Sequence, residues 1–289
     1  MSLEAEFARL ASAYRGGHRL VLLFDYDGTL SPIVAHPALA ELPKETRALL
    51  SQFKALDRVE VGIISGRSLV DLKSMVGLPG LLYAGSCGLE FESPEFSLVH
   101  PWVHTLRHYL EQAASSLTQI ASQYSGAWIE DKPHSFTVHY RAVPRDDAPL
   151  LQERLDHAMQ DYQGLLISVN GSKALEVLPD FGWNKGLAMQ FVIEKRAEPT
   201  HVLFAGNDSN DEQALELAAK LGGVAIGVGP HAPLNAQSHK LKNRRKHLSS
   251  LVIEEHRHVE PAKNGHPLLR SSEKNNDSSR RRSSGSFNR

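Results

Sequence analysis

Apolar residues along this chain follow two alternating patterns. Four short runs, residues 19–24, 59–64, 201–205 and 224–228, are apolar almost throughout and have the length of a β-strand. Around them, apolar residues recur at helical spacing, which predicts helices over 4–15, 44–56, 68–76, 185–196 and 211–221. Strands that are apolar on both faces and alternate with helices are typical of a parallel sheet covered by helices. The sequence therefore predicts an α/β fold with a parallel-sheet core.

The middle of the chain, residues 100–181, has a different pattern. It predicts two helices, 102–123 and 147–162, and four short strands, 127–130, 135–140, 165–169 and 174–178. An α/β segment that interrupts a parallel core is typical of a cap that covers an active site. We therefore expect a core domain formed by residues 1–99 together with 182–256, and an inserted cap domain over 100–181.

The last segment, residues 257–289, is poor in apolar side chains and rich in basic ones. It carries eight Lys or Arg and three Asp or Glu, a net charge of +5, which leaves −6 on the first 256 residues. Within 271–289 the one sizeable hydrophobic residue is Phe287. A segment with so few apolar residues cannot bury a core, so we expect a disordered basic tail.

Composition narrows the class of protein. The chain has 289 residues, of which 41% are hydrophobic and 22% charged, with a formal net charge of −1, so it gives no reason to expect binding to nucleic acid or to an anionic membrane. Its one cysteine, Cys87, cannot form an intramolecular disulfide. No apolar run reaches the roughly 18 residues of a membrane span, and no secretory signal is expected. We expect a cytoplasmic monomer that binds neither nucleic acid nor membrane.

Polar residues that could carry chemistry directly follow the predicted strands. Asp25 and Asp27 follow the first run, Ser65 follows the second, and Asp208 and Asp211 follow the third. In open α/β sheets, ligands bind beyond the carboxyl ends of the strands. We therefore expect these side chains to meet in one site.

The two aspartates after the first strand suit phosphate chemistry with a metal ion. Asp25 can offer a carboxylate oxygen, and Asp27 its backbone carbonyl, to one Mg²⁺, which prefers oxygen ligands and keeps several waters. The cation would offset the repulsion between an attacking carboxylate and a phosphate. Asp25 could then act as nucleophile, and Asp27 as acid for the leaving oxygen and base for the hydrolytic water.

Each of these features has an ordinary structural explanation when it is taken alone. An Asp-x-Asp-Gly segment also occurs in loops and calcium-binding turns, Ser65 could belong to a plain turn, and Asp211 could cap a helix. Lys185 follows Asn184, a suitable N-cap, but a lysine at a helix start is unfavourable unless an anion lies nearby. Their order along the chain, at strand ends and a helix start, favours one shared phosphate site.

The four elements together resemble the motifs of the haloacid-dehalogenase-like (HAD) phosphatases, which are Asp-x-Asp-x-Thr, a Ser or Thr after the second strand, a Lys, and an acidic cluster. A finer resemblance, over about residues 20–250, is to the trehalose-6-phosphate phosphatases. The segments that carry it are 23–33, 64–68, 83–90, 130–132, 138–141, 173–177 and 184–186.

This resemblance implies a Rossmann-like core with an inserted α/β cap, and a Mg²⁺-dependent phosphatase of trehalose biosynthesis that forms an aspartyl-phosphate and acts on trehalose 6-phosphate. It gives the catalytic roles to Asp25 as nucleophile, Asp27 as acid and base, and Ser65 and Lys185 as phosphate ligands. The predicted substrate-binding residues are Arg67, Lys132, His139, Arg141, Lys173 and Glu176. The candidate metal ligands are Asp25, Asp27, Asn207, Asp208 and Asp211.

Three positions depart from the family pattern. Asn207 replaces an Asp of the acidic cluster, Cys87 replaces a His, and Leu178 replaces an Arg. The neutral Asn207 is expected to weaken cation binding, which leaves a weakly active sugar-phosphate sensor as an alternative. Cys87 and Leu178 lie where the cap and core would face the sugar, so a phosphatase for sucrose phosphate, glucosylglycerol phosphate or a glycosyl phosphoglycerate is the other alternative.

Overall fold

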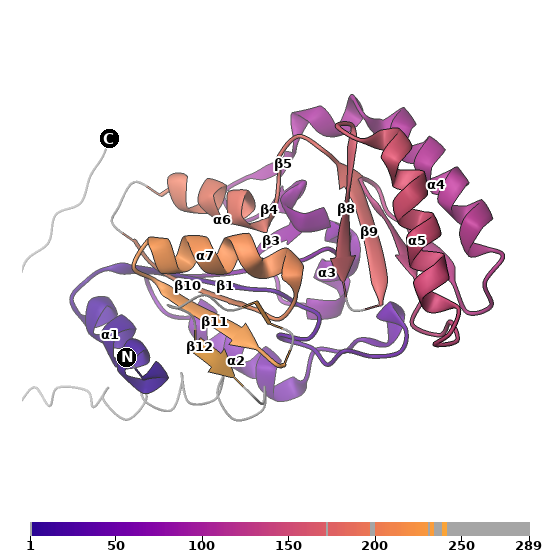
Figure 1. The fold of residues 1–289 in the computed structure, drawn as a ribbon. Helices are drawn as coiled ribbons and strands as arrows, with labels where there is room; N and C mark the ends of the chain where they lie inside the picture. The colour runs from indigo at the N-terminus through magenta and orange to yellow at the C-terminus, as the bar shows by residue number, and fades with distance from the viewer. Residues whose placement is uncertain (1, 172, 197–199, 231, 234–238, 242–289) are drawn as a thin grey trace, which may run out of the picture.

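The chain, shown in Figure 1 as a computed structural model, folds around two β-sheets. The structure describes residues 2–171, 173–196, 200–230, 232–233 and 239–241. The basic tail expected over 257–289 lies outside these residues. Within the described ranges, no helix has both the length and the apolar character needed to cross a membrane.

All four strands predicted from the apolar runs lie next to one another in the larger sheet, whose order is β12-β11-β10-β1-β2-β3-β4-β5. The central strand β1 (Arg19–Phe24) pairs in parallel with β10 (Thr200–Gly206) on one side and with β2 (Val59–Ile64) on the other. Strand β11 (Val224–Val228) extends the parallel pairing beyond β10. The carboxyl ends of these strands therefore meet at one edge of the sheet.

Four short strands extend the sheet beyond the sequence prediction. They are β3 (Leu82–Gly85), β4 (Glu90–Glu92), β5 (Ser97–Val99) and β12 (His239–Leu241). Strand β3 pairs in parallel with β2, and β12 with β11, whereas the pairs β3–β4 and β4–β5 are antiparallel. Each has three or four residues, which is too few to show a clear periodicity in the sequence.

Helices cover both faces of this sheet (Figure 1): α1 (Leu3–Arg15), α2 (Lys44–Lys54) and α3 (Leu69–Val76) pack on one face, and α6 (Lys185–Glu194) and α7 (Glu212–Lys220) on the other. Consecutive residues of β1 pack into different clusters, Leu22 with the first set of helices and Leu23 with the second. Burial of one leucine contributes about 1.5–3 kcal/mol. Both faces therefore hold β1 in place and fix the position of Asp25 at its end.

The second sheet lies beside the first and has helices on one face only. Its strands, in the order β6-β7-β9-β8, are all antiparallel: β6 (Trp128–Asp131), β7 (Phe136–His139), β9 (Ala174–Pro179) and β8 (Leu166–Gly171). Helices α4 (Arg107–Ala121) and α5 (Ala148–Met159) pack on the outer face (Figure 1). Phe136 and Val138 point into that packing, so Thr137 and His139 face the other way.

Two predicted helices start with a separate 3₁₀ turn. The helix predicted over 102–123 is η3 (Pro101–His104) followed by α4, and that predicted over 211–221 is η5 (Ser209–Asp211) followed by α7. At η5, the Asp208 side chain accepts from the Ser209 amide, and this capping bond starts the turn before Asp211. The other 3₁₀ turns are η1 (Pro37–Leu39), η2 (Ser86–Gly88) and η4 (Gln160–Tyr162).

Candidate active site

Asp25 is the first residue after the central strand β1, at the sheet edge where the neighbouring parallel strands also end. Its amide donates to the Ala205 carbonyl of β10 at 2.9 Å, which continues the parallel pairing past the end of β1. The residue is 5% exposed and lies, together with Asp27, on the wall of a cavity of about 200 Å³. The sheet therefore places a buried carboxylate on the wall of a small, partly open cavity.

The cavity lies between the core strand ends and the helix-free face of the second sheet. Most predicted site residues line it: Asp25, Asp27, Ser65, Arg67, Lys132, His139, Arg141, Lys173, Glu176, Asn207 and Asp208. The other two, Lys185 and Asp211, are buried in the core, and Lys185 contacts Asp25. The fold thus brings together residues from the start, middle and end of the described chain.

Lys185 joins two buried carboxylates. Its Nζ donates to Asp25 Oδ1 at 2.7 Å and to Asp211 Oδ1 at 2.7 Å, and the residue is 1% exposed. Helix α6 begins at Lys185, with Asn184 as its N-cap. The positive charge at this helix start would be unfavourable by itself. The two carboxylates compensate for it.

The charges in this network shift one another's protonation. Burial raises the pKa of Asp25 to about 8, and the Asp211 carboxylate adds to this rise while Lys185 opposes it. Although burial would lower the pKa of Lys185, the carboxylates of Asp211 and Asp25 raise it well above its ordinary value. With Asp25 ionised, two carboxylates and one ammonium leave a net charge of −1. A cation bound next to Asp25 would offset this charge and favour the ionised form of Asp25.

Oxygen ligands for such a cation converge at Asp25. One terminal atom of the Asn207 amide lies 2.7 Å from the Asp27 carbonyl oxygen and 2.9 Å from Asp25 Oδ2. With the amide oxygen at that position, three oxygens meet; with the nitrogen there, the amide donates to the same two oxygens. Gly28 has φ 87°, and a Cβ on it would lie 2.3 Å from the Asn207 amide, so glycine is required for this approach.

This set of oxygens fits Mg²⁺, which takes few protein ligands and retains waters. In the described part of the chain, no group of three or more His, Cys, Asp or Glu side chains is arranged to hold a metal ion. The oxygens next to Asp25 do not form such a group, because only one of them belongs to an acidic side chain and the others belong to a backbone carbonyl and an amide.

Asp211 differs from the sequence expectation of a metal ligand. Its Oδ1 binds Lys185, its Oδ2 accepts from the amides of Asn207 (2.9 Å) and Asp208 (3.1 Å), and the residue has no exposed surface. Both oxygens are therefore used to hold Lys185 and the loop that carries Asn207. Asp208 does line the cavity, and its carboxylate accepts from the Ser209 amide at 2.8 Å.

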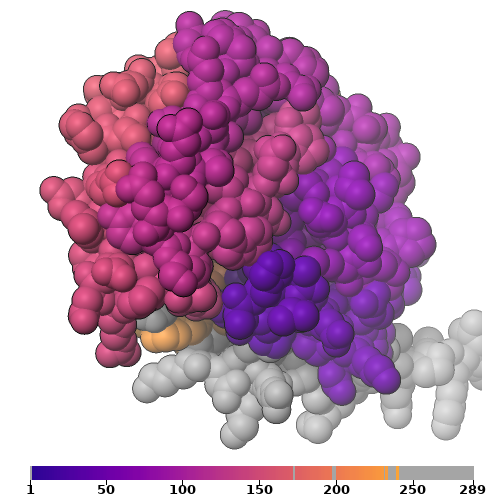
Figure 2. All heavy atoms as spheres, turned by 90° about the vertical axis from the view of Figure 1, so that its right-hand side faces the viewer, coloured from indigo at the N-terminus to yellow at the C-terminus, as the bar shows by residue number. Residues whose placement is uncertain are grey.

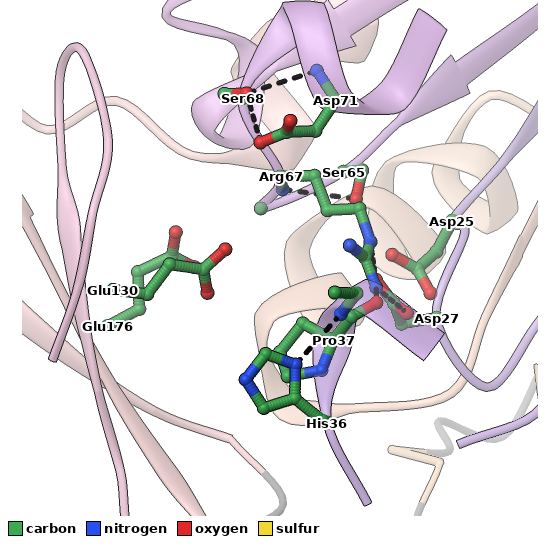
Figure 3. A network of polar contacts seen from close by, with 12 residues as sticks. Asp25, Asp27, His36, Pro37, Ser65, Arg67, Ser68, Asp71, Glu130 and Glu176 are labelled. Atoms are coloured by element: carbon green, nitrogen blue, oxygen red, sulfur yellow. Dashed lines mark hydrogen bonds and ion pairs between the residues drawn. The ribbon is translucent and has the colours of Figure 1, made fainter. Parts of the chain in front are cut away.

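Arg67 binds Asp27 through two parallel hydrogen bonds (Figure 3). Its Nε donates to Asp27 Oδ2 at 2.6 Å and its Nη2 to Oδ1 at 2.7 Å, while Nη2 also donates to the Pro37 carbonyl at 2.9 Å. Such bidentate pairs fix the plane of the carboxylate. Arg67 was predicted to bind substrate, whereas in the structure its guanidinium binds Asp27. No sequence pattern indicates this pairing.

Ser65 lies at the end of β2 and is 1% exposed. Its amide donates to the Ala84 carbonyl of β3, and its Oγ accepts from the Arg67 amide at 3.2 Å. Because the oxygen accepts this bond, the hydroxyl hydrogen can donate to another acceptor in the cavity.

The cap side of the cavity carries paired charges. Lys132 Nζ donates to Glu176 Oε1 at 3.0 Å and to the Gly66 carbonyl of the core at 2.8 Å. His139 Nε2 lies 2.7 Å from Glu130 Oε2. Burial alone would raise the pKa of Glu130, but the hydrogen bond to His139 and the charge of Lys132 lower it. Figure 3 shows the Glu130 and Glu176 carboxyl groups extending from the cap sheet toward the core residues.

The sequence prediction omitted, among others, two polar residues of this face, Glu130 and Thr137, which line the same cavity. Glu130 of β6 is opposite Thr137 of β7, which is opposite Glu176 of β9, so the three form a row across the sheet. The Thr137 hydroxyl is buried and has no hydrogen-bond partner among the described residues. Strand alternation over 135–140 was a usable signal, because it places Thr137 on the same face as the predicted His139.

Two of the departures from the family pattern lie in one place. Cys87 and Leu178 belong to a small hydrophobic cluster with Leu89 and Val103. Cys87 Sγ lies 3.6 Å from Glu176 Oε2, and burial raises the pKa of the thiol, so it remains a protonated donor. The two departures from the family pattern therefore lie together, next to Glu176, the cap carboxylate that faces the cavity.

Comparison with known proteins identifies the family of the chain. The family model described as trehalose-phosphatase matches residues 23–246. A trehalose-phosphate phosphatase of Mycobacterium marinum is 35% identical over 215 residues, covering 73% of this chain and 54% of the relative. A rice (Oryza sativa) protein named probable trehalose-phosphate phosphatase 4 is 30% identical over 233 residues, covering 78% of this chain and 62% of the relative. The chain thus spans a little over half the length of these curated relatives.

Solved structures show the same fold. The C-terminal domain of Candida albicans trehalose-6-phosphate phosphatase has a TM-score of 0.72 at 22% identity, covering 86% of this chain and 95% of that one. A Synechocystis sucrose-phosphatase has a TM-score of 0.51 at 17% identity, covering 83% and 98%. At these identities the likeness concerns the α/β core and inserted cap alone. Because the family model covers more than half of the sequence, the chain belongs to the trehalose-phosphatase family.

Proposed function

We propose that the chain is a phosphatase that removes phosphate from trehalose 6-phosphate, with Asp25 as nucleophile. The observation that carries the proposal is the position of the Asp25 carboxylate. It lies on the cavity wall, is bound to Lys185, and is close to the Asn207 amide, which also approaches the Asp27 carbonyl. The named activity of the curated relatives supports the choice of substrate.

The proposed reaction has two successive steps, and the residues around Asp25 have different roles in them. An Asp25 oxygen forms a bond to phosphorus while the bond from phosphorus to the sugar oxygen breaks. For Asp27 to act as the acid, one of its oxygens must leave Arg67 and carry a proton; it then gives this proton to the leaving sugar oxygen and later takes a proton from a water molecule. The water attacks the phosphorus of the aspartyl-phosphate, which releases inorganic phosphate and restores the Asp25 carboxylate. Ser65 and Lys185 donate to the phosphate oxygens in both steps.

The cofactor that fits the donor set is Mg²⁺, held by Asp25, the Asp27 carbonyl and Asn207, with Asp208 as a further candidate ligand. When bound, it would supply positive charge that offsets the repulsion between Asp25 and the phosphate. Asp211 acts in this proposal through Lys185 and the backbone amides that it binds.

The cap provides the contacts to the sugar in this proposal. We divide the chain into a core, 1–99 with 182–256, and a cap, 100–181, whose sheet faces the strand ends of the core. Lys132, Arg141, Lys173 and Glu176 line the cavity from the cap, and such side chains donate to or accept from sugar hydroxyls. When the cap closes on the core it excludes bulk water from the phosphate.

A different glycosyl phosphate is the second candidate substrate. The observation that favours it is the small hydrophobic cluster that contains Cys87 and Leu178 and lies beside Glu176. At these two positions the family has a histidine and an arginine. Comparison of kcat/KM for trehalose 6-phosphate and sucrose 6-phosphate tests it. A preference for trehalose 6-phosphate below about tenfold would favour this alternative.

The direct test of the proposed nucleophile is Asp25→Asn, which keeps the size of the side chain and removes its charge. We expect phosphate release to fall roughly a thousandfold or more, because the attacking group is lost. Asp156→Asn, on the exposed side of α5, is the matched control and should behave as wild type. Wild-type turnover by Asp25→Asn would show that the assigned nucleophile is wrong.

A further inference from the structure

Trp128 stacks on two imidazole rings that come from different parts of the chain. Its ring lies on that of His139, opposite it on the neighbouring strand, with centroids 4.3 Å apart and planes at 17°. It also stacks on His36, with centroids 4.7 Å apart and planes at 3°. His36 belongs to the core segment between β1 and α2, whereas Trp128 and His139 belong to the cap sheet.

This stack joins core and cap at the edge of the cavity. In Figure 2 the core segment between β1 and α2 is an indigo lobe that abuts the magenta and pink cap. Its residues 33–35 and Pro37 line the cavity, as do Trp128 and His139. The stack is therefore a direct contact between the two sides of the site.

The last member of the stack holds a cavity carboxylate. His139 Nε2 lies 2.7 Å from Glu130 Oε2, and Glu130 faces the cavity from the cap. A continuous line of contacts therefore runs from His36 through Trp128 and His139 to the Glu130 carboxylate. No member of this line forms a hydrogen bond or ion pair with Asp25 or Lys185, so the line can affect substrate binding separately from the phosphate chemistry.

The ring of His36 is itself held by a backbone amide of the turn that follows it. Its Nδ1 accepts from the Ala38 amide at 3.2 Å and caps the 3₁₀ turn η1 (Figure 3). The imidazole therefore has two separate contacts, one through a ring nitrogen and one through its flat face. Substitutions can remove either contact and leave the other in place.

We propose that His36 and Trp128 are positioning residues, which act through His139 to hold the Glu130 carboxylate toward the sugar of the substrate. This inference rests on the proposed function, because it takes the ligand of the cavity to be a glycosyl phosphate. An ionised carboxylate accepts hydrogen bonds from sugar hydroxyls. Without the stack, the His139 ring turns more freely and Glu130 spends less time in the binding position, so sugar binding weakens while attack by Asp25 is unchanged.

Two variants of His36 separate the effect of the ring stack from that of the hydrogen bond to the Ala38 amide. His36→Asn keeps an acceptor for the Ala38 amide and removes the ring, whereas His36→Phe keeps a stacking ring and removes the acceptor. We expect His36→Asn to raise KM for trehalose 6-phosphate by about three- to tenfold, the range of an aromatic stack, with kcat within about twofold of wild type. His36→Phe should stay within about twofold on both constants. With p-nitrophenyl phosphate, which has no sugar, both variants should match wild type.

A double-variant cycle tests whether the effect passes through Glu130. In a Glu130→Gln background, which already weakens the acceptor, His36→Asn should change KM by less than about twofold. Thermal unfolding of every variant by circular dichroism checks that each one is folded before its KM is interpreted.

The outcomes are distinct. An unchanged KM in His36→Asn, an equal loss on p-nitrophenyl phosphate, or a loss in His36→Phe as large as in His36→Asn would overturn the positioning role. A full effect of His36→Asn in the Glu130→Gln background would also overturn it. Wild-type protein that hydrolyses p-nitrophenyl phosphate but no sugar phosphate would instead overturn the proposed function, and the sugar role of Glu130 with it.

Discussion

On the core side of the cavity, three buried side chains form a closed network of charges, whereas the cap side carries separate pairs. In the core, Lys185 binds both Asp25 and Asp211, and all three are almost fully buried, beside the pair of Arg67 and Asp27. On the cap side, Lys132 pairs with Glu176 and His139 pairs with Glu130, with no hydrogen bond from one pair to the other. The closed network holds the Asp25 carboxylate in one position, while separate pairs can exchange partners with sugar hydroxyls. Under the proposed function, this contrast gives the reaction chemistry to the core and substrate recognition to the cap.

The largest expected effect comes from opening the core network. Lys185→Met removes the ammonium and leaves the buried carboxylates of Asp25 and Asp211 facing each other. We expect phosphate release to fall by about a thousandfold, and the free energy of unfolding to drop by about 3–5 kcal/mol, as when one partner of a buried ion pair is removed. Phosphate-release kinetics and urea unfolding measure the two effects. Lys220→Met, at the end of α7, is the control, and wild-type stability in Lys185→Met would contradict the closed network.

The next effect is a pH dependence of stability in protein freed of metal with EDTA. The pKa of Asp25 is about 8 in the folded protein against an ordinary value of 3.8. The folded state therefore holds a proton that the unfolded state has lost, and this stabilisation disappears as the pH rises through 8. Between about pH 6 and about pH 8, the free energy of unfolding should fall by about 2 kcal/mol more in wild type than in Asp25→Asn. Parallel curves for the two proteins would count against the raised pKa.

A smaller effect is expected when a cap pair is broken. Glu176→Gln removes the charge that binds Lys132 and one acceptor of the cavity. We expect KM for trehalose 6-phosphate to rise about tenfold, as for the loss of a charged hydrogen bond, with little change for p-nitrophenyl phosphate. Equal losses on both substrates would mean that the cap and core do not divide recognition from chemistry.

The smallest effect concerns the hydroxyl between the two cap carboxylates. Thr137→Val replaces a buried hydroxyl that has no partner among the described residues with a methyl group of similar shape. We expect the free energy of unfolding to rise by up to about 1 kcal/mol, because an unsatisfied polar group is removed. A thermal midpoint below that of wild type would show that this hydroxyl is hydrogen-bonded in solution.

The sequence predicts the central strands well, because residues 20–24 and 224–228 are apolar throughout and have one structural explanation. It does not predict β4 (Glu90–Glu92), which is three residues long and has two glutamates. That strand forms because it pairs with β3 and β5, and such tertiary pairing leaves no local periodicity.

The same limit applies to the site. Asp25 can be found from its place after a buried strand, since that place follows from the sheet. The bond from Arg67 to Asp27 cannot be predicted in this way, because the residues are 40 positions apart and meet only when β1 and β2 pair. For Asp211 the sequence shows an acid at a helix start but not the direction of its carboxylate, which points to Lys185.

The central claim, that Asp25 accepts the phosphoryl group, can be tested by trapping the intermediate. Enzyme quenched in acid during turnover of trehalose 6-phosphate with Mg²⁺ is reduced with borohydride, which converts an acyl phosphate on aspartate to homoserine, and is then mapped by peptide mass spectrometry. We predict homoserine at position 25, in wild type and only when substrate is present. Reduction at another carboxylate, or at none while phosphate is released, would contradict the account.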